Sequence, residues 1–392
     1  MNSKLNLHQM NLYDIAWILL STLILYQFSQ LRFINSFQYF DEIITVFLFA
    51  LAVLHSKENQ RISQDEKIYY ITMIIIVIIG FVGNLYSKIP RSLYAISVDL
   101  IASLRMLITL WATRVLFNSK KAYNVIISQI KIFVCVAFFF MVVNLVSDAN
   151  LGMKYDVRFG LNSFQFIFPH PTVLVSSMCN FLALLTFDGV KKNMKYILIV
   201  LLLIISSFRS KGIGLVLMYI YVLLFMNKQQ FKLNRIIPLI PIAIYTVWDN
   251  ISIYFMNGTS ARLLLHLQAI NVANNYFPVG AGYSAYETYG AIVDYSSIYL
   301  QNGFNSVYGL SQEMNSFAID AFWPAILGQF GRLGVIVFIY GLYKIYRATS
   351  KNVDFNNSFP LEKSFSDILR LAALLNILFF IPFLFHMLLQ WE

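Results

Sequence analysis

Apolar segments of about 20 residues recur along the chain, and this repetition constrains the fold more than any other feature. About 20 helical residues cross the ~30 Å hydrocarbon core of a bilayer, so each such run is a candidate membrane span. The expected spans are 13–33, 39–54, 68–87, 94–117, 124–147, 170–188, 195–208, 212–226, 236–255, 321–343 and 366–390. Three of them are short, so we expect 11 spans within a range of 10–12. The pattern predicts an all-α polytopic membrane protein.

The composition agrees with this pattern, because 58% of the 392 residues are hydrophobic and only 12% are charged. Soluble domains carry roughly 25% charged residues, and a soluble chain of this size has too little core to hide so much apolar surface. The composition therefore excludes a soluble enzyme, a disordered chain and a disulfide scaffold. Both cysteines, Cys135 and Cys179, lie inside apolar runs, as is typical of small buried hydrophobic residues.

The basic residues are distributed unevenly between alternate connections, and this indicates the orientation of the chain. The chain has a net charge of +10, but it has no basic block with interleaved aromatic residues outside the short loops, so we exclude nucleic acid as a partner. With the N-terminus in the cytoplasm, 17 of the 29 Lys and Arg residues lie on the cytoplasmic side and eight in the outer connections. We therefore expect one integral-membrane domain, 1–392, with a cytoplasmic N-terminus and an extracytoplasmic loop at 256–320.

This 65-residue loop is the largest segment outside the expected spans, and it is rich in Tyr, Asn, Gly and Ser. Long loops in compact proteins are usually functional or disordered, and the tyrosine content argues against disorder. The tyrosines are Tyr276, Tyr283, Tyr286, Tyr289, Tyr295, Tyr299 and Tyr308. Two interpretations stay open: a packed cap over the bundle, or a surface whose aromatic faces and hydroxyl groups suit sugar rings.

A basic pair interrupts the apolar stretch between Tyr196 and Met226. As one helix this stretch would be about 46 Å long, which is too long for a single crossing. We therefore expect two short helices that meet at 208–212, below the outer surface. Arg209 and Lys211 would then lie in the outer leaflet, where charges are costly and usually face a cavity or a ligand. Either both side chains reach the headgroups, or they form a buried anion site, for which phosphate is the favoured ligand.

Other polar residues in the expected spans carry less information. Asp99 and Arg105 are six residues apart, so they do not share a helix face, and we expect each to pair with another helix. Arg332 lies well inside the tenth span and follows a glycine-rich motif. The five histidines are scattered without metal-ligand spacing and no acidic cluster is visible, so we expect no metal dependence.

Three motifs in order resemble the O-antigen ligase/polymerase superfamily. Their order and spacing and the layout of 10–12 spans agree with that family, so the resemblance covers most of the chain. The Phe-Arg-Ser-Lys-Gly junction at 208–212 is similar to a Ser-Arg-Gly element of that family. Segments 259–262, 269–270 and 276–283 resemble its outer-loop signature of an arginine, a short amphipathic helix and a Pro-x-Gly-x-Gly turn. Segment 320–334 looks like the matching return into the membrane, as in Wzy-type polymerases of capsular and exopolysaccharide clusters.

The chain departs from the family pattern at two positions. Ligases of the superfamily typically carry a His-Asn pair 11 residues before a Gly-x-x-Gly motif, and counting back from Gly331 gives Asp320. Lys211 stands at the position of a family arginine, and Arg209 is the candidate to take over that role. The missing histidine weakens the ligase interpretation and leaves the polymerase interpretation standing.

The resemblance implies polymerisation of oligosaccharide repeat units at the outer face of the bacterial cytoplasmic membrane. The donor is an undecaprenyl-diphosphate-linked glycan, and a hydroxyl of another lipid-linked repeat unit attacks its anomeric carbon. Such a glycosyltransferase of O-antigen, capsule or exopolysaccharide biosynthesis needs no cofactor and no nucleotide sugar. The expected partners are the lipid-linked donor and acceptor, membrane lipid and a chain-length regulator.

The departing diphosphate gives roles to the basic residues, because fixed cations stabilise the negative charge that develops in the transition state. The candidate catalytic residues are Arg209, Lys211, Arg262 and Asp320. The candidate substrate-binding residues are Arg158, Gly280, Gly282, Tyr283, Glu313, Trp323 and Arg332. The carboxylates that are candidates to take the hydroxyl proton are Asp320, Glu313, Asp294 and Glu287.

Three alternatives stay open. A ligase would move a finished glycan onto a different acceptor, and the absent histidine counts against it. A transporter or flippase of lipid-linked glycan would distribute its cations along a central cavity, whereas the charged and aromatic residues of this chain crowd one side. A structural membrane subunit would not explain cations below the outer surface.

Overall fold

The described part of the chain is mostly helical. The computed structural model describes residues 40–55, 62–116, 120–146, 153–158, 160–225, 260–319 and 321–351, with the single positions 15, 18, 19 and 241. These residues form two compact units. The described residues of the first unit lie within Met1–Glu58 and Thr109–Val247, and those of the second within Asn59–Ile108 and Trp248–Asn352.

Helices are present at eight of the eleven expected spans. They are α2 (Phe40–His55), α3 (Gln64–Ser87), α4 (Leu93–Leu116), α5 (Lys120–Val146), α6 (Pro171–Phe187), α7 (Val190–Ser206), α8 (Ser210–Phe225) and α13 (Phe322–Lys351). Within the described residues, the segments long and apolar enough to cross a membrane are Gln64–Ser87, Tyr123–Val146 and Phe322–Ile345. Outside the described residues, apart from the four single positions, lie the expected spans 13–33, 236–255 and 366–390.

Helix α3 has the surface expected of a helix in contact with lipid. Ile71, Ile74 and Ile78 follow one another at helical spacing, and each is more than half exposed. Ile76 and Ile79, on the opposite side of the helix, are each 5% exposed. In water a continuous stripe of exposed isoleucine would be unfavourable, whereas in a bilayer it faces an apolar solvent.

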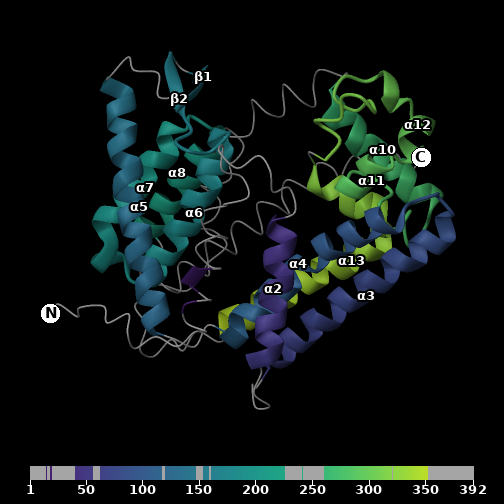
Figure 1. Ribbon diagram of the computed structural model, residues 1–392, viewed down its shortest axis with the longest axis horizontal. Coiled ribbons are helices and arrows are strands. Elements are labelled where there is room, and N and C mark those ends of the chain that lie inside the picture. Colours follow the sequence, from purple (N-terminus) through teal and green to yellow (C-terminus); the bar gives the residue numbers. More distant parts are fainter. Residues whose placement is uncertain are drawn as a thin grey trace. The chain divides into compact units, whose positions relative to one another are not determined.

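The first unit contains a helical bundle in which α5, α6, α7 and α8 lie side by side (Figure 1). Helix α7 contacts each of the other three. The side chains at the centre of this bundle are fully buried and include Ile130, Phe181, Leu185, Val200 and Leu203. Asn193 closes the turn between α6 and α7, because its amide group donates to the Leu185 carbonyl at 3.0 Å and to Asp188 at 2.9 Å.

An antiparallel hairpin of β1 (Lys154–Arg158) and β2 (Leu161–Phe164) precedes α6. The turn between the strands contains Gly160, whose φ of +77° is easily reached by glycine. Phe166, just after β2, packs its ring 5.5 Å from that of Phe133 on α5 and anchors the hairpin to the bundle. The sequence expectation of an all-α chain did not include this hairpin.

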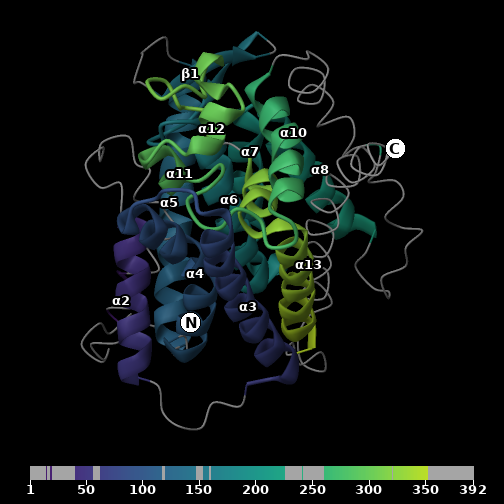
Figure 2. The same ribbon diagram turned by 90° about the vertical axis from the view of Figure 1, so that its right-hand side faces the viewer.

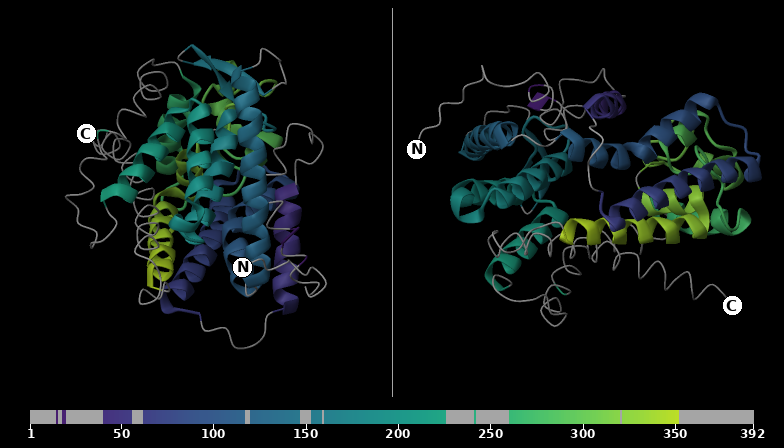
Figure 3. Two further views of the ribbon diagram at one scale, coloured as in Figure 1. Left: turned by 90° about the vertical axis from the view of Figure 1, so that its left-hand side faces the viewer. Right: turned by 90° about the horizontal axis from the view of Figure 1, so that it is seen from below.

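The second unit is built around α3 and α13, which run alongside one another (Figure 3). Helix α10 (Ala261–Asn275) packs on α13. The short helices α11 (Tyr289–Val293) and α12 (Ser297–Gln301) follow it in the chain (Figure 2), and the 3₁₀ helix η5 (Phe304–Ser306) comes next. Helix α4 begins in this unit, and its residues from Thr109 onward belong to the first.

The outer-loop segment of the second unit has an aromatic core of its own. Tyr286, Tyr295 and Tyr299 are at most 6% exposed, and the Tyr299 ring lies 5.9 Å from that of Tyr286 and 5.5 Å from that of Tyr295, centroid to centroid. The Tyr286 hydroxyl donates to the Leu265 carbonyl at 2.6 Å, which satisfies its polar group inside the core. These three tyrosines are therefore packing residues. Tyr308 is 74% exposed, so its ring is accessible and its role in sugar binding stays a prediction.

Candidate functional site

The basic junction predicted at 208–212 is a tight turn between α7 and α8. Helix α7 ends at Ser206, and Phe208 adopts a left-handed φ of +48° that redirects the chain. The Ile213 N–H donates to the Arg209 carbonyl at 3.0 Å, so Arg209 is the residue that precedes the first turn of α8. The expectation of two short helices that meet at this basic pair is confirmed.

The start of α8 approaches α6 and α7 closely because Gly212 has no side chain. A Cβ atom at this position would lie 3.1 Å from Ile204 on α7 and 3.2 Å from Val175 on α6. Both distances are shorter than most contacts of real Cβ atoms. The glycine therefore lets the first turn of α8 pack closely against Val175 on α6 and Ile204 on α7.

His170 caps the N-terminus of α6. Its backbone is extended, Pro171 occupies the first helical position, and its Nδ1 accepts the Thr172 N–H at 3.1 Å. This cap satisfies one of the N–H groups that a helix N-terminus leaves without an intrahelical acceptor. His170, which precedes α6, and Arg209, which precedes α8, lie next to each other.

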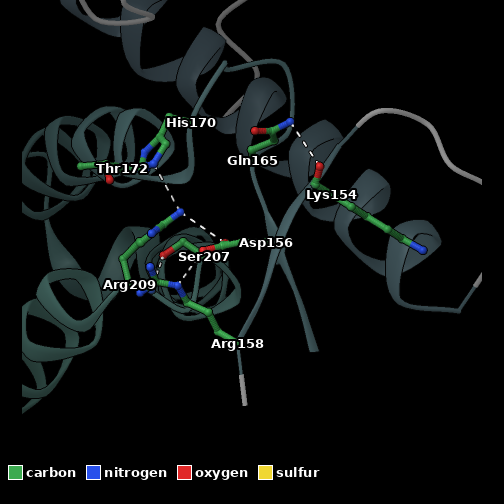
Figure 4. A network of polar contacts seen from close by, with 8 residues as sticks. All are labelled: Lys154, Asp156, Arg158, Gln165, His170, Thr172, Ser207 and Arg209. Carbon is green, nitrogen blue, oxygen red and sulfur yellow. Dashed lines mark hydrogen bonds and ion pairs between the residues drawn. The ribbon is translucent and has the colours of Figure 1, made fainter. Parts of the chain in front are cut away.

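The Arg209 guanidinium lies at the centre of a polar cluster that we call the hairpin cluster, formed by Tyr155, Asp156, Arg158, His170 and Arg209. Figure 4 shows all of these except Tyr155. The Nη2 atom of Arg209 lies 3.3 Å from Oδ1 of Asp156 and 3.4 Å from Nε2 of His170. The guanidinium also stacks over the Tyr155 ring, 5.4 Å from the ring centroid. The Arg209 side chain is only 14% exposed, so its charge is held largely away from water.

Asp156 connects the two arginines of the hairpin cluster. Its Oδ2 accepts from Nε of Arg158 at 2.8 Å, while Oδ1 faces Arg209. Partial burial raises the pKa of this carboxyl, but the Ser163 hydroxyl, Arg158 and Arg209 outweigh burial and hold the pKa below its ordinary value. Asp156 is therefore ionised at neutral pH, and the two arginines outnumber the one carboxylate by one positive charge.

Of the candidate residues in the first unit, the structure brings Arg158 and Arg209 together through Asp156. Lys211 lies in the first turn of α8, and its side chain is outside the described part of the structure. Sequence reasoning did not single out Asp156 or His170. The His-Pro-Thr order at 170–172, typical of a helix N-cap followed by proline, was the signal for the position of His170.

The two glycine motifs of the second unit pack directly against each other. The N–H groups of Ala281 and Gly282 donate to the carbonyl groups of Gly328 and Gln329 at 2.9 and 2.8 Å. This pairing brings the Pro-x-Gly-x-Gly turn onto α13 at the point where that helix is interrupted.

Gly280 and Gly331 form the closest part of this contact. A Cβ atom on Gly280 would lie 2.3 Å from the Gly331 nitrogen, and both glycines have positive φ angles, +74° and +63°. Gly331 is non-helical and breaks α13, which the sequence predicted as an uninterrupted span. Gly282 is held in a similar way, because a Cβ there would lie 2.3 Å from the Asn84 nitrogen on α3. Close backbone packing accounts for these glycines, and their role in substrate binding stays a prediction.

Tyr283 is fully buried in the second unit. Its ring contacts those of Phe81 and Phe330 edge-on at 5.5 and 5.4 Å, and its hydroxyl lies 3.3 Å from that of Ser103 on α4. A substrate could touch Tyr283 only if the loop moved, so its predicted role in binding is not visible in this packing.

The other candidates of the second unit occupy separate positions. Arg332, just after the break in α13, donates to Oδ1 of Asn274 at 2.5 Å. Arg262 lies in the first turn of α10, where its carbonyl accepts from Nδ1 of His266 at 2.7 Å. The Trp323 ring lies at the start of α13, and its centroid is 5.6 Å from that of the Phe322 ring. The exposed Glu313 belongs to the outer loop, and Asp320 lies outside the described residues.

Two carboxylates tie the outer loop to α4. Asp99 accepts from the Ser284 N–H at 2.9 Å, the Thr288 hydroxyl at 2.5 Å and the Gly290 N–H at 3.0 Å. Asp294 accepts from the N–H and the hydroxyl of Ser92 at the start of α4. Asp99 therefore anchors a loop, whereas the sequence predicted an ion pair with another helix, and Asp294 is engaged by Ser92.

Glu287, a candidate proton acceptor, is 3% exposed, and its N–H donates to the Tyr299 hydroxyl at 2.7 Å. Among the residues that the structure describes, no three His, Cys, Asp or Glu side chains are grouped to hold a metal ion.

Comparison with protein-family models, curated proteins and solved structures found no match to this chain.

Proposed function

We propose that this chain polymerises undecaprenyl-diphosphate-linked oligosaccharide repeat units at the outer face of the bacterial cytoplasmic membrane. An acceptor hydroxyl oxygen forms a bond with the anomeric carbon of the donor. The bond between that carbon and the diphosphate breaks, and the diphosphate leaves with the electron pair. The proton of the hydroxyl passes to a carboxylate. The observation that carries the proposal is the hairpin cluster, with its excess positive charge.

The hairpin cluster has the chemistry that a departing diphosphate requires. Arg209 and Arg158 present guanidinium groups, which bind phosphate oxygens in a bidentate manner and stay charged. Each helix N-terminus adds the equivalent of roughly half a positive charge, and α6 and α8 both begin here. In a site with little water, removing one such donor costs about 3 kcal/mol of transition-state stabilisation.

The proposed topology places the hairpin cluster and the outer loop on the same side of the membrane. We propose eleven spans with a cytoplasmic N-terminus, because basic residues collect in the connections that then face the cytoplasm. The connection that contains β1 and β2 and the loop 256–320 are then both extracytoplasmic. Arg262, Asp320 and Glu313 belong to that loop. We propose that Arg262 binds the donor diphosphate and that the two carboxylates orient the acceptor hydroxyl.

Complementation of a strain that lacks the gene tests this function. Arg209→Ala should abolish polymer while single lipid-linked repeat units accumulate and the protein still reaches the membrane. Lys192→Ala is the matched control, because this exposed cation pairs with Asp188 at 2.9 Å, away from the hairpin cluster. Normal polymer from Arg209→Ala would contradict the proposal. Transfer of single units onto another acceptor would favour the ligase.

A further inference from the structure

The hydrogen bond of His170 determines which ring nitrogen carries a proton. Its Nδ1 lies 3.1 Å from the backbone nitrogen of Thr172, which is a donor. Nδ1 therefore accepts and has no proton of its own. The imidazole in this cap is neutral, and its single proton is on Nε2. The ring thus presents an N–H donor toward the hairpin cluster.

The donor on Nε2 of His170 faces a second donor. The Nη2 atom of Arg209 lies 3.4 Å away, and a guanidinium group has no acceptor. These two groups therefore cannot hydrogen-bond to one another. Figure 4 shows the ring and the guanidinium directed toward the same place from the starts of α6 and α8. Two nitrogens at this separation can both donate to a single oxygen atom at ordinary hydrogen-bond distances.

The carboxylate of Asp156 is held mainly by its other partner. Its bond to Nε of Arg158 is 2.8 Å long, whereas its contact with Arg209 is 3.3 Å. A ligand with more negative charge than a carboxylate can replace Asp156 at Arg209 and leave the pair with Arg158 intact. The excess positive charge of the cluster favours such a replacement.

We propose that His170 and Arg209 form a phosphate-oxyanion site in which Nε2 of His170 and Nη2 of Arg209 donate to one phosphate oxygen. The identity of the ligand as the diphosphate of a lipid-linked glycan rests on the proposed function. His170 is then a binding residue of the site as well as the cap of α6. The ring of Tyr155, 4.7 Å from that of His170, holds the imidazole in this orientation.

Two substitutions separate the cap from the donor. In His170→Asn, the side-chain oxygen can take the place of Nδ1 and cap the Thr172 N–H, but no donor reaches the position of Nε2. In His170→Gln, the amide nitrogen can reach the position of Nε2, but the cap is lost. The full chain, purified in detergent, is titrated with inorganic pyrophosphate by calorimetry, and its thermal unfolding is followed in parallel.

We expect His170→Asn to bind pyrophosphate at least about tenfold more weakly than wild type, with an unchanged melting temperature. His170→Gln should keep binding within about threefold of wild type and should melt at a lower temperature. Wild-type binding by His170→Asn, or an equal loss in both variants, would overturn the oxyanion site. Lys192→Ala should match wild type in both measurements.

The same titration separates this site from the proposed function. Loss of pyrophosphate binding in His170→Asn supports the oxyanion site whether or not cells carrying it still make polymer. Loss of polymer in Arg209→Ala together with normal binding in His170→Asn overturns the oxyanion site and leaves the proposed function standing. Competition by farnesyl diphosphate at lower concentration than by phosphatidylglycerol supports a polyprenyl diphosphate as the ligand, and the reverse order overturns that assignment.

Discussion

Replacing Asp99 by asparagine should loosen the outer-loop segment between Ser284 and Gly290 without unfolding the helices. The Asp99 side chain is 5% exposed, and each of its oxygens accepts a backbone N–H from this segment. An asparagine keeps one oxygen and places an NH₂ group where the other oxygen was. One backbone N–H then faces a donor instead of an acceptor.

The size of the effect follows from these contacts. A buried donor that loses its acceptor costs about 1–3 kcal/mol, and hydrogen bonds to a charged group are stronger than those to a neutral one. For Asp99→Asn we therefore expect about 3 kcal/mol less stability of the loop against local opening, which corresponds to roughly a hundredfold larger open population. The cost is local, because the bonds of Asp99 join α4 to this one segment.

Hydrogen exchange of the detergent-purified chain measures this opening. Peptides that contain Ser284 and Gly290 should exchange about a hundredfold faster in Asp99→Asn, while peptides from α3 keep the wild-type rate. Ser97→Ala on the same helix is the control, because its exposed hydroxyl donates to the Leu93 carbonyl within α4. Wild-type exchange of the loop in Asp99→Asn would refute the anchoring role.

Two further predictions follow from single contacts, and a third follows from the proposed orientation of the chain. Gly280→Ala should prevent correct folding, whereas Gly303→Ala, with a similar φ of +69° but open space around it, should cost only about 1 kcal/mol of backbone strain, as thermal unfolding can show. Pairing with the arginines lowers the pKa of Asp156, so the ionised carboxylate stabilises the folded protein fully above about pH 4, and this contribution is lost as the pH falls through the lower folded pKa. Asp156→Asn lacks this contribution, so its melting temperature should decrease less in acid than that of wild type. A cysteine at Asn302 should react with an impermeant thiol reagent in intact cells and one at Asn356 should not, and the opposite result would reverse the orientation.

The sequence predicts the long helices of the described part of the chain well, because apolar runs of the right length leave few alternatives. The junction near Arg209 is also predictable, since the stretch from Tyr196 to Met226 is too long for one span and contains two cations. The short strands near Asp156 were missed because a hairpin of this size carries little hydrophobic periodicity.

The contacts within the candidate site are harder to predict than its elements. The bond between Asp99 and Gly290 joins residues 191 positions apart, and no local pattern reveals it. The break of α13 at Gly331 exists because the turn at Gly280 needs room, which is again a contact between distant segments. His170 looked like a scattered histidine, since its role depends on the approach of Arg209 from another helix.

Reconstitution of the purified protein into liposomes with its lipid-linked repeat unit tests the central proposal most directly. We predict a ladder of glycans in multiples of the repeat unit, with one undecaprenyl diphosphate released for each new linkage. Arg209→Ala should give no ladder under the same conditions, while Lys192→Ala should give the wild-type ladder. Movement of the lipid-linked unit across the bilayer without any new glycosidic bond, or an unchanged ladder from Arg209→Ala, would contradict the proposed polymerase.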